Sequence, residues 1–186
     1  MTAAPLILVA AGGMFMGILT GRAAARLWLM TTLASVIAAF TAAVMVLAGH
    51  DEWEWRSVFL LGGEPLHFRL DAISAFFLVL LCVVGGAGAV YGNEYWSNAE
   101  HPCSARSGRV WWSALVLSLG VVLLISNGLH FLIAWELFTL SAYFLITLDR
   151  RRPEVRAAGW LYLGASHAAV LALFAFFTLL AARTGS

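Results

Sequence analysis

The sequence predicts an all-α, polytopic membrane protein with about six transmembrane helices, and its composition is the first reason. Of the 186 residues, 62% are hydrophobic and 11% are charged, and the mean hydropathy is +0.88. An ordinary soluble domain is far less apolar than this. The second reason is that long apolar runs recur along the chain, with the charged residues gathered between them. The formal net charge of +1 gives no field that favours nucleic acid as a partner.

Six apolar runs are each interpreted as one span of a single transmembrane domain, residues 1–186. The first run is short and contains glycine. Arg22 and Arg26 follow it, whereas a signal peptide carries its positive charge before its apolar core. The expected spans cover residues 3–20, 27–49, 71–92, 109–126, 129–148 and 157–182.

The segment between the second and third spans, residues 50–70, is polar and aromatic. It contains Trp53 and Trp55, and tryptophan is typical of membrane–water interfaces. The pair Gly62-Gly63 separates residues 58–61 from residues 66–69, and this pattern predicts a short β-hairpin.

Arginine predicts the orientation of the chain, since all eleven basic residues are arginine. With the first loop placed inside, eight arginines face inward and three face outward. An excess of basic residues marks the cytoplasmic side of a cell membrane. Six spans then place both termini on the outer, periplasmic face. The inner arginines are Arg22, Arg26, Arg106, Arg109, Arg150, Arg151, Arg152 and Arg156, and the outer ones are Arg56, Arg69 and Arg183.

A carboxylate inside the fifth span is the main functional candidate. A helix over residues 129–148 is long enough to cross a hydrocarbon core of about 30 Å. Glu136 lies within it, and a charge at that depth costs about 3 kcal/mol, so it marks a functional site by default. At about 100° per residue, Thr139, Tyr143 and Thr147 lie close to the angular position of Glu136. Their hydroxyls can hold water and satisfy the carboxyl, or they can bond only to backbone carbonyls and a neighbouring helix.

His167 in the sixth span is expected at the depth of Glu136. Pro153 and the arginines before it are expected to end the fifth helix, and residues 149–156 form a charged turn. The two helices are therefore antiparallel, and both side chains lie about 15 to 18 Å from the inner surface. A carboxylate and an imidazole both suit a proton relay. A histidine here can equally serve as a structural hydrogen-bonding group, and one chain does not show whether the two share a face.

The run NGLHFLIAWELFTLSAYFLITL, residues 127–148, resembles the fifth transmembrane helix of the antiporter-like subunits. These are the proton-translocating membrane subunits shared by respiratory complex I, membrane-bound hydrogenases of the formate hydrogenlyase type and Mrp-type antiporters. The core Trp135-Glu136-Leu137, followed by Ser141 and Tyr143, is the most specific part. The runs FRLDAISAFFLVLL and YLGASHAAV, which contains His167, add weaker similarity, the latter to the hydrogenase-type members.

The resemblance implies that Glu136 belongs to a proton path, with His167, Tyr143 and Thr139 as further candidates. In the family the glutamate works with lysines on later helices, but this chain has no lysine. The resemblance therefore implies the N-terminal part of a subunit, or a split subunit, completed by other membrane subunits of a redox or antiporter complex. The redox chemistry, of the NADH dehydrogenase or hydrogenase type, would then lie in those partners.

Two other readings stay open: a small stand-alone transporter that forms homo-oligomers, and a purely structural membrane segment. No motif for a metal, a phosphate or a redox cofactor is present, so no cofactor is expected within the chain. Cys82 and Cys103 suit neither a disulfide framework nor a metal site, and Cys82 is expected to pack in the core. Asp71 and Glu94 lie at expected helix ends, where a capping or solvated role is favoured.

Overall fold

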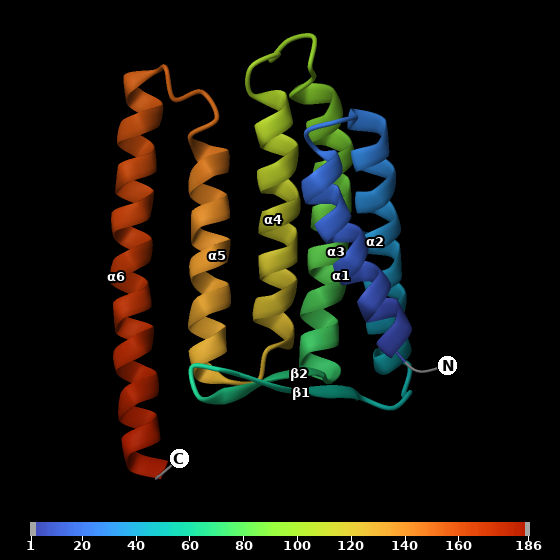
Figure 1. Cartoon of the computed structure of the whole chain (residues 1–186), viewed down its shortest axis with the longest axis vertical. Helices are drawn as coiled ribbons and strands as arrows, with labels where there is room; N and C mark the ends of the chain where they lie inside the picture. Colours follow the sequence, from blue (N-terminus) through green and yellow to red (C-terminus); the bar gives the residue numbers. More distant parts are fainter. Residues whose placement is uncertain (1–2, 185–186) are drawn as a thin grey trace.

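The structure, a computed structural model, describes residues 3–184, which form six helices and one two-stranded antiparallel sheet (Figure 1). The fold class is confirmed as mainly helical, but the strict all-α assignment is wrong because the hairpin between the second and third helices is a regular sheet. The elements are α1 (Ala4–Thr20), α2 (Ala25–Leu47), β1 (Trp53–Leu61), β2 (Glu64–Leu70), α3 (Ala72–Tyr95), α4 (Ala105–Leu124), α5 (Gly128–Ile146) and α6 (Pro153–Thr184).

The helices run alternately up and down. The loops after α1, α3 and α5 meet at one end of the bundle, whereas the hairpin and both chain ends lie at the other (Figure 1). Within residues 3–184, five helices, α2 to α6, are long and apolar enough to cross a membrane. Helix α1 has 17 residues and is shorter than the other spans. These lengths and compositions fit a multi-pass membrane protein.

Two predicted boundaries shift at the charged turns. Helix α4 begins at Ala105 rather than at residue 109, and α6 begins at Pro153 rather than at residue 157. The prediction that residues 149–156 form one turn is therefore wrong in its second half. Proline fits the first residue of a helix, because the N–H it lacks would have no intrahelical partner there. Helix α5 ends earlier, at Ile146.

Small residues allow α1, α2 and α4 to pack closely. A Cβ atom added to Gly17 of α1 would lie 2.9 Å from Ser113 Oγ of α4. Trp28 of α2 is only 2% exposed, and its indole Nε1 donates to Ser113 Oγ at 2.8 Å. In a bilayer, where lipid tails are as apolar as the side chains, close packing and hydrogen bonds of this kind hold helices together.

The hairpin lies across one end of the bundle (Figure 1). One of its faces is apolar and the other is charged. Its turn uses Gly62 and Gly63 at φ +64° and +88°, the positive values that a tight two-residue turn requires. The predicted turn is thereby confirmed, with longer strands than expected. The register pairs Trp53 with Leu70 and Trp55 with Phe68 on the inner face, where Leu70 is fully buried.

The outer face of the hairpin carries ion pairs. Glu52 pairs with Arg69 at 2.7 Å, and Glu54 pairs with Arg56 at 2.9 Å and with His67 at 2.7 Å. The hydrogen bond from Arg56, followed by that from His67, lowers the pKa of Glu54. The pKa of Arg69 is raised by its bond to Glu52. Because the side chains of a strand alternate, the apolar face can cover the bundle while these charges face water.

Candidate functional site

Helix α5 carries Glu136 and is fixed at both ends. Asn127 Oδ1 caps its start by accepting the backbone N–H groups of Leu129 and His130 at 2.9 and 3.3 Å. Near its other end, α6 approaches closely at a glycine, since a Cβ on Gly159 would lie 3.1 Å from Tyr143 Cε2. Helices α5 and α6 lie side by side and antiparallel (Figure 1), as predicted.

The structure brings Glu136 and His167 together. Glu136 Oε2 lies 3.8 Å from His167 Nε2. The two residues were predicted to lie at equal depth, and the structure also turns their side chains toward each other, which the sequence did not decide. The distance is within ion-pair range and longer than a direct hydrogen bond.

The hydrogen bonding of His167 limits where its protons can be. Its Nδ1 lies 2.9 Å from Leu163 O. A carbonyl oxygen only accepts, so Nδ1 carries a proton in this arrangement. In the neutral ring Nε2 is then a bare acceptor facing the carboxyl group. A proton on Nε2 or on the carboxyl group would give the two facing groups one donor and one acceptor.

Glu136 lines an apolar groove between α5 and α6. The groove has a volume of about 530 Å³, and Leu132, Ile133, Val170 and Phe174 are among its lining residues. The side chains of Glu136 and His167 are 32% and 51% exposed, so neither is sealed inside this chain. Within residues 3–184, Glu136 has no Arg partner in an ion pair. Both side chains are therefore accessible from outside this chain, and Glu136 is open to whatever covers this groove.

The three hydroxyl side chains that were predicted to share the angular position of Glu136 differ in their contacts. Thr147 donates to the backbone oxygen of Tyr143 at 2.9 Å, as expected for a hydroxyl that satisfies only its own helix. Thr139 is 1% exposed, and its Oγ1 has no hydrogen-bond partner in the described part of the chain. The Tyr143 ring packs edge-on against Phe144, with ring centroids 5.3 Å apart. No hydrogen bond joins Glu136 to Thr139 or Tyr143 among the described residues.

Sequence reasoning missed His130. This side chain is 3% exposed, and its Nε2 lies 2.9 Å from Leu61 O at the end of β1. The buried Nδ1 has no hydrogen-bond partner among residues 3–184. The bond ties the start of α5 to the hairpin. Its partner is distant in sequence, so the only available signal was a polar residue three positions after the Asn127 cap.

Arg109 also has a structural role, which its use as a marker of membrane orientation did not indicate. It is 5% exposed and lies near the start of α4, and α4 begins at the end of the bundle opposite the hairpin (Figure 1). Its Nε donates to Gly21 O at 3.0 Å, and its terminal nitrogens donate to Asn98 Oδ1, each at 3.2 Å. It therefore joins the turn after α1 to the loop after α3.

Two minor predictions are confirmed. Asp71 caps α3 by accepting the N–H of Ser74 at 2.8 Å, and this bond lowers the pKa of Asp71. Cys82 is 4% exposed and belongs to the hydrophobic core. Glu94 lies in the last turn of α3 and is exposed.

Comparisons with known proteins give distant relatives. No family model matches the chain. It is 30% identical over 130 residues to an uncharacterized protein of Mycobacterium tuberculosis found in two strains, and the match covers 68% of this chain and 19% of that protein. It is 25% identical over 121 residues to Hydrogenase-4 component B of Escherichia coli, with 65% of this chain and 18% of that protein covered. The chain thus spans about a fifth of the length of the curated relatives that it matches.

Proposed function

We propose that this chain is a membrane subunit, or the N-terminal part of one, in a proton- or cation-translocating respiratory or hydrogenase complex. Glu136 and His167 hold and pass the translocated proton. The observation that carries this proposal is the 3.8 Å approach of Glu136 Oε2 to His167 Nε2 inside two apolar helices. Ionisable groups at such positions are costly and mark ion or proton pathways.

The hydrogen bond from His167 Nδ1 to Leu163 O supports a relay role. Because Nδ1 is hydrogen bonded to Leu163 O, only Nε2 of the imidazole is free to exchange a proton with Glu136. The carboxyl can receive a proton from His167 and release it toward the open groove, or work in the reverse direction. Thr139 and Tyr143 are further candidates for the path, and the unpartnered Oγ1 of Thr139 supports its inclusion.

Other membrane subunits, or a longer form of this chain, complete the path. The exposed apolar surface of α6 and the open groove support this part of the proposal. So does the match to Hydrogenase-4 component B, of which the chain covers 18%. The chain contains no lysine, so a lysine that balances Glu136 would come from the covering partner. The redox chemistry belongs to partner subunits.

The proposed orientation places both termini on the periplasmic face. The eight inner arginines lie on the loops after α1, α3 and α5 or near their helix ends, all at the bundle end opposite the hairpin (Figure 1). Exposed Cys103 lies on one of these loops. A membrane-impermeant maleimide should therefore label Cys103 in inside-out vesicles and not in intact cells, and labelling in intact cells would reverse the orientation.

The central test is Glu136→Gln in the assembled complex, which keeps size and hydrogen bonding but removes the titration. Proton uptake into sealed vesicles, driven by the redox reaction of the complex, should fall at least about tenfold. Glu136→Asp retracts the acid by about 1.5 Å and should be intermediate. His167→Gln should cost less than Glu136→Gln, because a water chain can replace a relay partner more readily than the titrating acid.

Glu154→Gln is the matched control, since it removes an exposed carboxylate from the first turn of α6. It should leave uptake unchanged, and native gels should show equal assembly of all variants. Full uptake by an assembled Glu136→Gln complex would indicate a structural segment instead. Recovery of only homo-oligomers after gentle solubilisation would favour a stand-alone transporter.

A further inference from the structure

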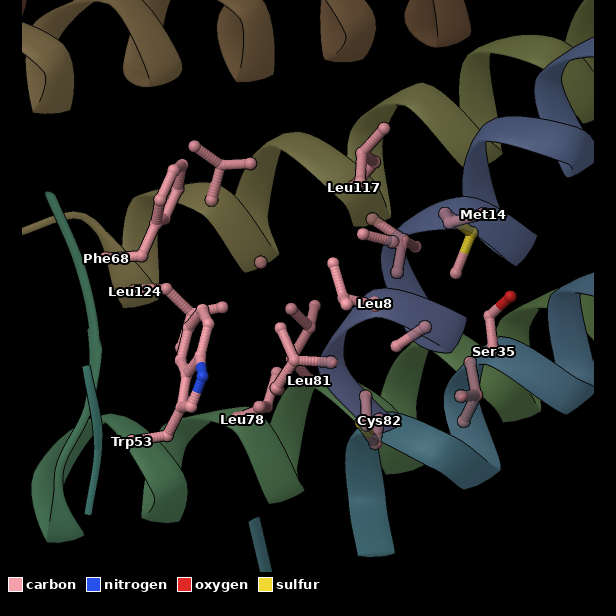
Figure 2. A pocket seen from close by; sticks show the side chains of 18 of the residues that line it. Leu8, Met14, Ser35, Trp53, Phe68, Leu78, Leu81, Cys82, Leu117 and Leu124 are labelled. Atoms are coloured by element: carbon pink, nitrogen blue, oxygen red, sulfur yellow. The ribbon is translucent and has the colours of Figure 1, made fainter. Parts of the chain in front are cut away.

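A second cavity lies in the other half of the molecule, away from Glu136. It has a volume of about 330 Å³ and lies between α1, α2, α3 and α4 beneath the hairpin. Trp53, Phe68 and Leu124 line one end of the cavity, whereas Met14 and Ser35 line the other (Figure 2). Leucine side chains line the part between the two ends. We propose that this cavity binds one acyl chain of a glycerophospholipid from the leaflet on the hairpin side, with Trp53 Nε1 donating to the ester carbonyl.

The lining excludes water as a stable occupant. Almost every lining side chain is aliphatic or aromatic. The hydroxyl of Ser35 already donates to Thr31 O at 2.7 Å. A buried water needs two to four polar partners, so an apolar cavity of this kind does not hold ordered water. An apolar occupant fits the lining instead.

The length of the cavity matches one leaflet. Along α1 the lining residues extend from Ala4 to Met14. Ten residues of helix rise about 15 Å, which is half of a hydrocarbon core of about 30 Å. The cavity therefore reaches from the membrane boundary to about mid-depth. A single chain of a lipid in the adjacent leaflet has this reach, whereas a transmembrane helix would need the full thickness.

Trp53 supplies the polar complement at the boundary. Its indole points into the cavity from the inner face of β1 (Figure 2). Among the described residues its Nε1–H has no hydrogen-bond partner, so this donor is available to a ligand. The ester carbonyls of a glycerophospholipid lie at the depth where tryptophan gathers, directly above the acyl chains. The donor and the apolar channel thus match the two parts of one lipid.

The entrance reaches the lipid-facing surface of the bundle. Leu8 lines the cavity and is 70% exposed. Met14 and Cys82, which also line it, are only 5% and 4% exposed. A chain that enters past Leu8 can touch these two buried residues, whereas lipid at the outer surface cannot. This difference makes the inference testable in the intact protein.

The experiment uses a phosphatidylcholine that carries a diazirine midway along one acyl chain. The full chain, with its native partners, is reconstituted with this probe and irradiated, and adducts are mapped by peptide mass spectrometry. Wild-type protein should give adducts on Met14 and Cys82 that excess unlabelled phosphatidylcholine suppresses. Absence of these adducts, or suppression by an isoprenoid quinone but not by phospholipid, would overturn the proposal.

Two glycines provide a matched pair of variants. Gly120 lines the cavity and Gly12 lies on the exposed side of α1, and a Cβ at either would meet no atom within 4 Å. Gly120→Leu should lower the Met14 and Cys82 adducts at least about tenfold by occupying the channel, whereas Gly12→Leu should not change them. Equal adducts in both variants would overturn the proposal.

Trp53→Phe tests the polar end without filling the channel. It should lower the adducts about threefold, the effect of one hydrogen bond, whereas Trp160→Phe on α6 should have no effect. Unchanged adducts in Trp53→Phe would exclude the indole from the site. Because Trp53→Phe retains an aromatic ring, this arm remains decisive if Gly120→Leu fails to fold.

Discussion

Helices α2 and α6 are both apolar along their length, yet they differ in how the chain uses them. In the most apolar stretch of α2, 39% of the residues are buried inside the structure, whereas none are in the corresponding stretch of α6. Helix α2 packs with α1, α3 and α4 through small residues, while α6 contacts α5. Apolar composition alone therefore does not distinguish a helix that is packed inside this chain from one that lies at its edge.

The two candidate sites follow this division. The acyl-chain cavity lies among the packed helices α1 to α4, where each wall belongs to this chain. Glu136 and His167 lie between α5 and α6, where both side chains remain partly exposed. The first site is complete as it stands, whereas the second has an open side that a partner can cover.

The largest expected effect compares two tryptophans, one in each region. Trp28→Ala removes a side chain that is 2% exposed and hydrogen bonded to Ser113, and should lower the free energy of unfolding by about 4 kcal/mol. Trp160→Ala, at 67% exposure on α6, should change it by less than about 0.5 kcal/mol. Unfolding in mixed micelles, followed by circular dichroism, measures both. Equal losses would contradict the division between the two regions.

A smaller effect is expected at the connection between the regions. His130→Phe keeps a ring of similar size but removes the hydrogen bond to Leu61 O. The hairpin should open more readily by about 1 kcal/mol, or about fivefold in its rate of amide hydrogen exchange. His101→Phe, in the loop at the other end of the bundle, is the control and should leave hairpin exchange unchanged. If His130→Phe also leaves it unchanged, the hairpin is held by its other contacts.

The smallest effect concerns the charged face of the hairpin. The pKa of Glu54 in the folded chain lies below its ordinary value of 4.5, mainly because Arg56 donates to it. The stability from these bonds is therefore present above that value and is lost as the pH falls through the lowered pKa. Hairpin amide exchange, expressed relative to the intrinsic rate at each pH, should therefore lose protection slightly over this range in wild-type protein and less in Glu54→Gln. An equal response in both would exclude Glu54 as the cause.

Sequence reasoning located the elements better than their contacts. The Gly62-Gly63 turn was predictable because two adjacent glycines have a specific use in tight hairpins. The rise of a helix placed Glu136 and His167 at one depth, but their rotation depends on how α5 and α6 pack, which Gly159 and Tyr143 decide. His130 and Arg109 were not predictable, since their partners Leu61 and Gly21 are 69 and 88 residues away.

The attachment of the hairpin has a mechanical consequence. Its strands continue into α2 and α3, while Ser126 donates to His67 O at 2.9 Å and His130 contacts Leu61 O at the same distance. A two-stranded ribbon resists bending more than a single extended loop does, so the hairpin connects α2, α3 and α5 rigidly across this end of the bundle. An axial shift of α5 would therefore strain the hairpin, and a displacement of α5 at Glu136 would be transmitted to α2 and α3.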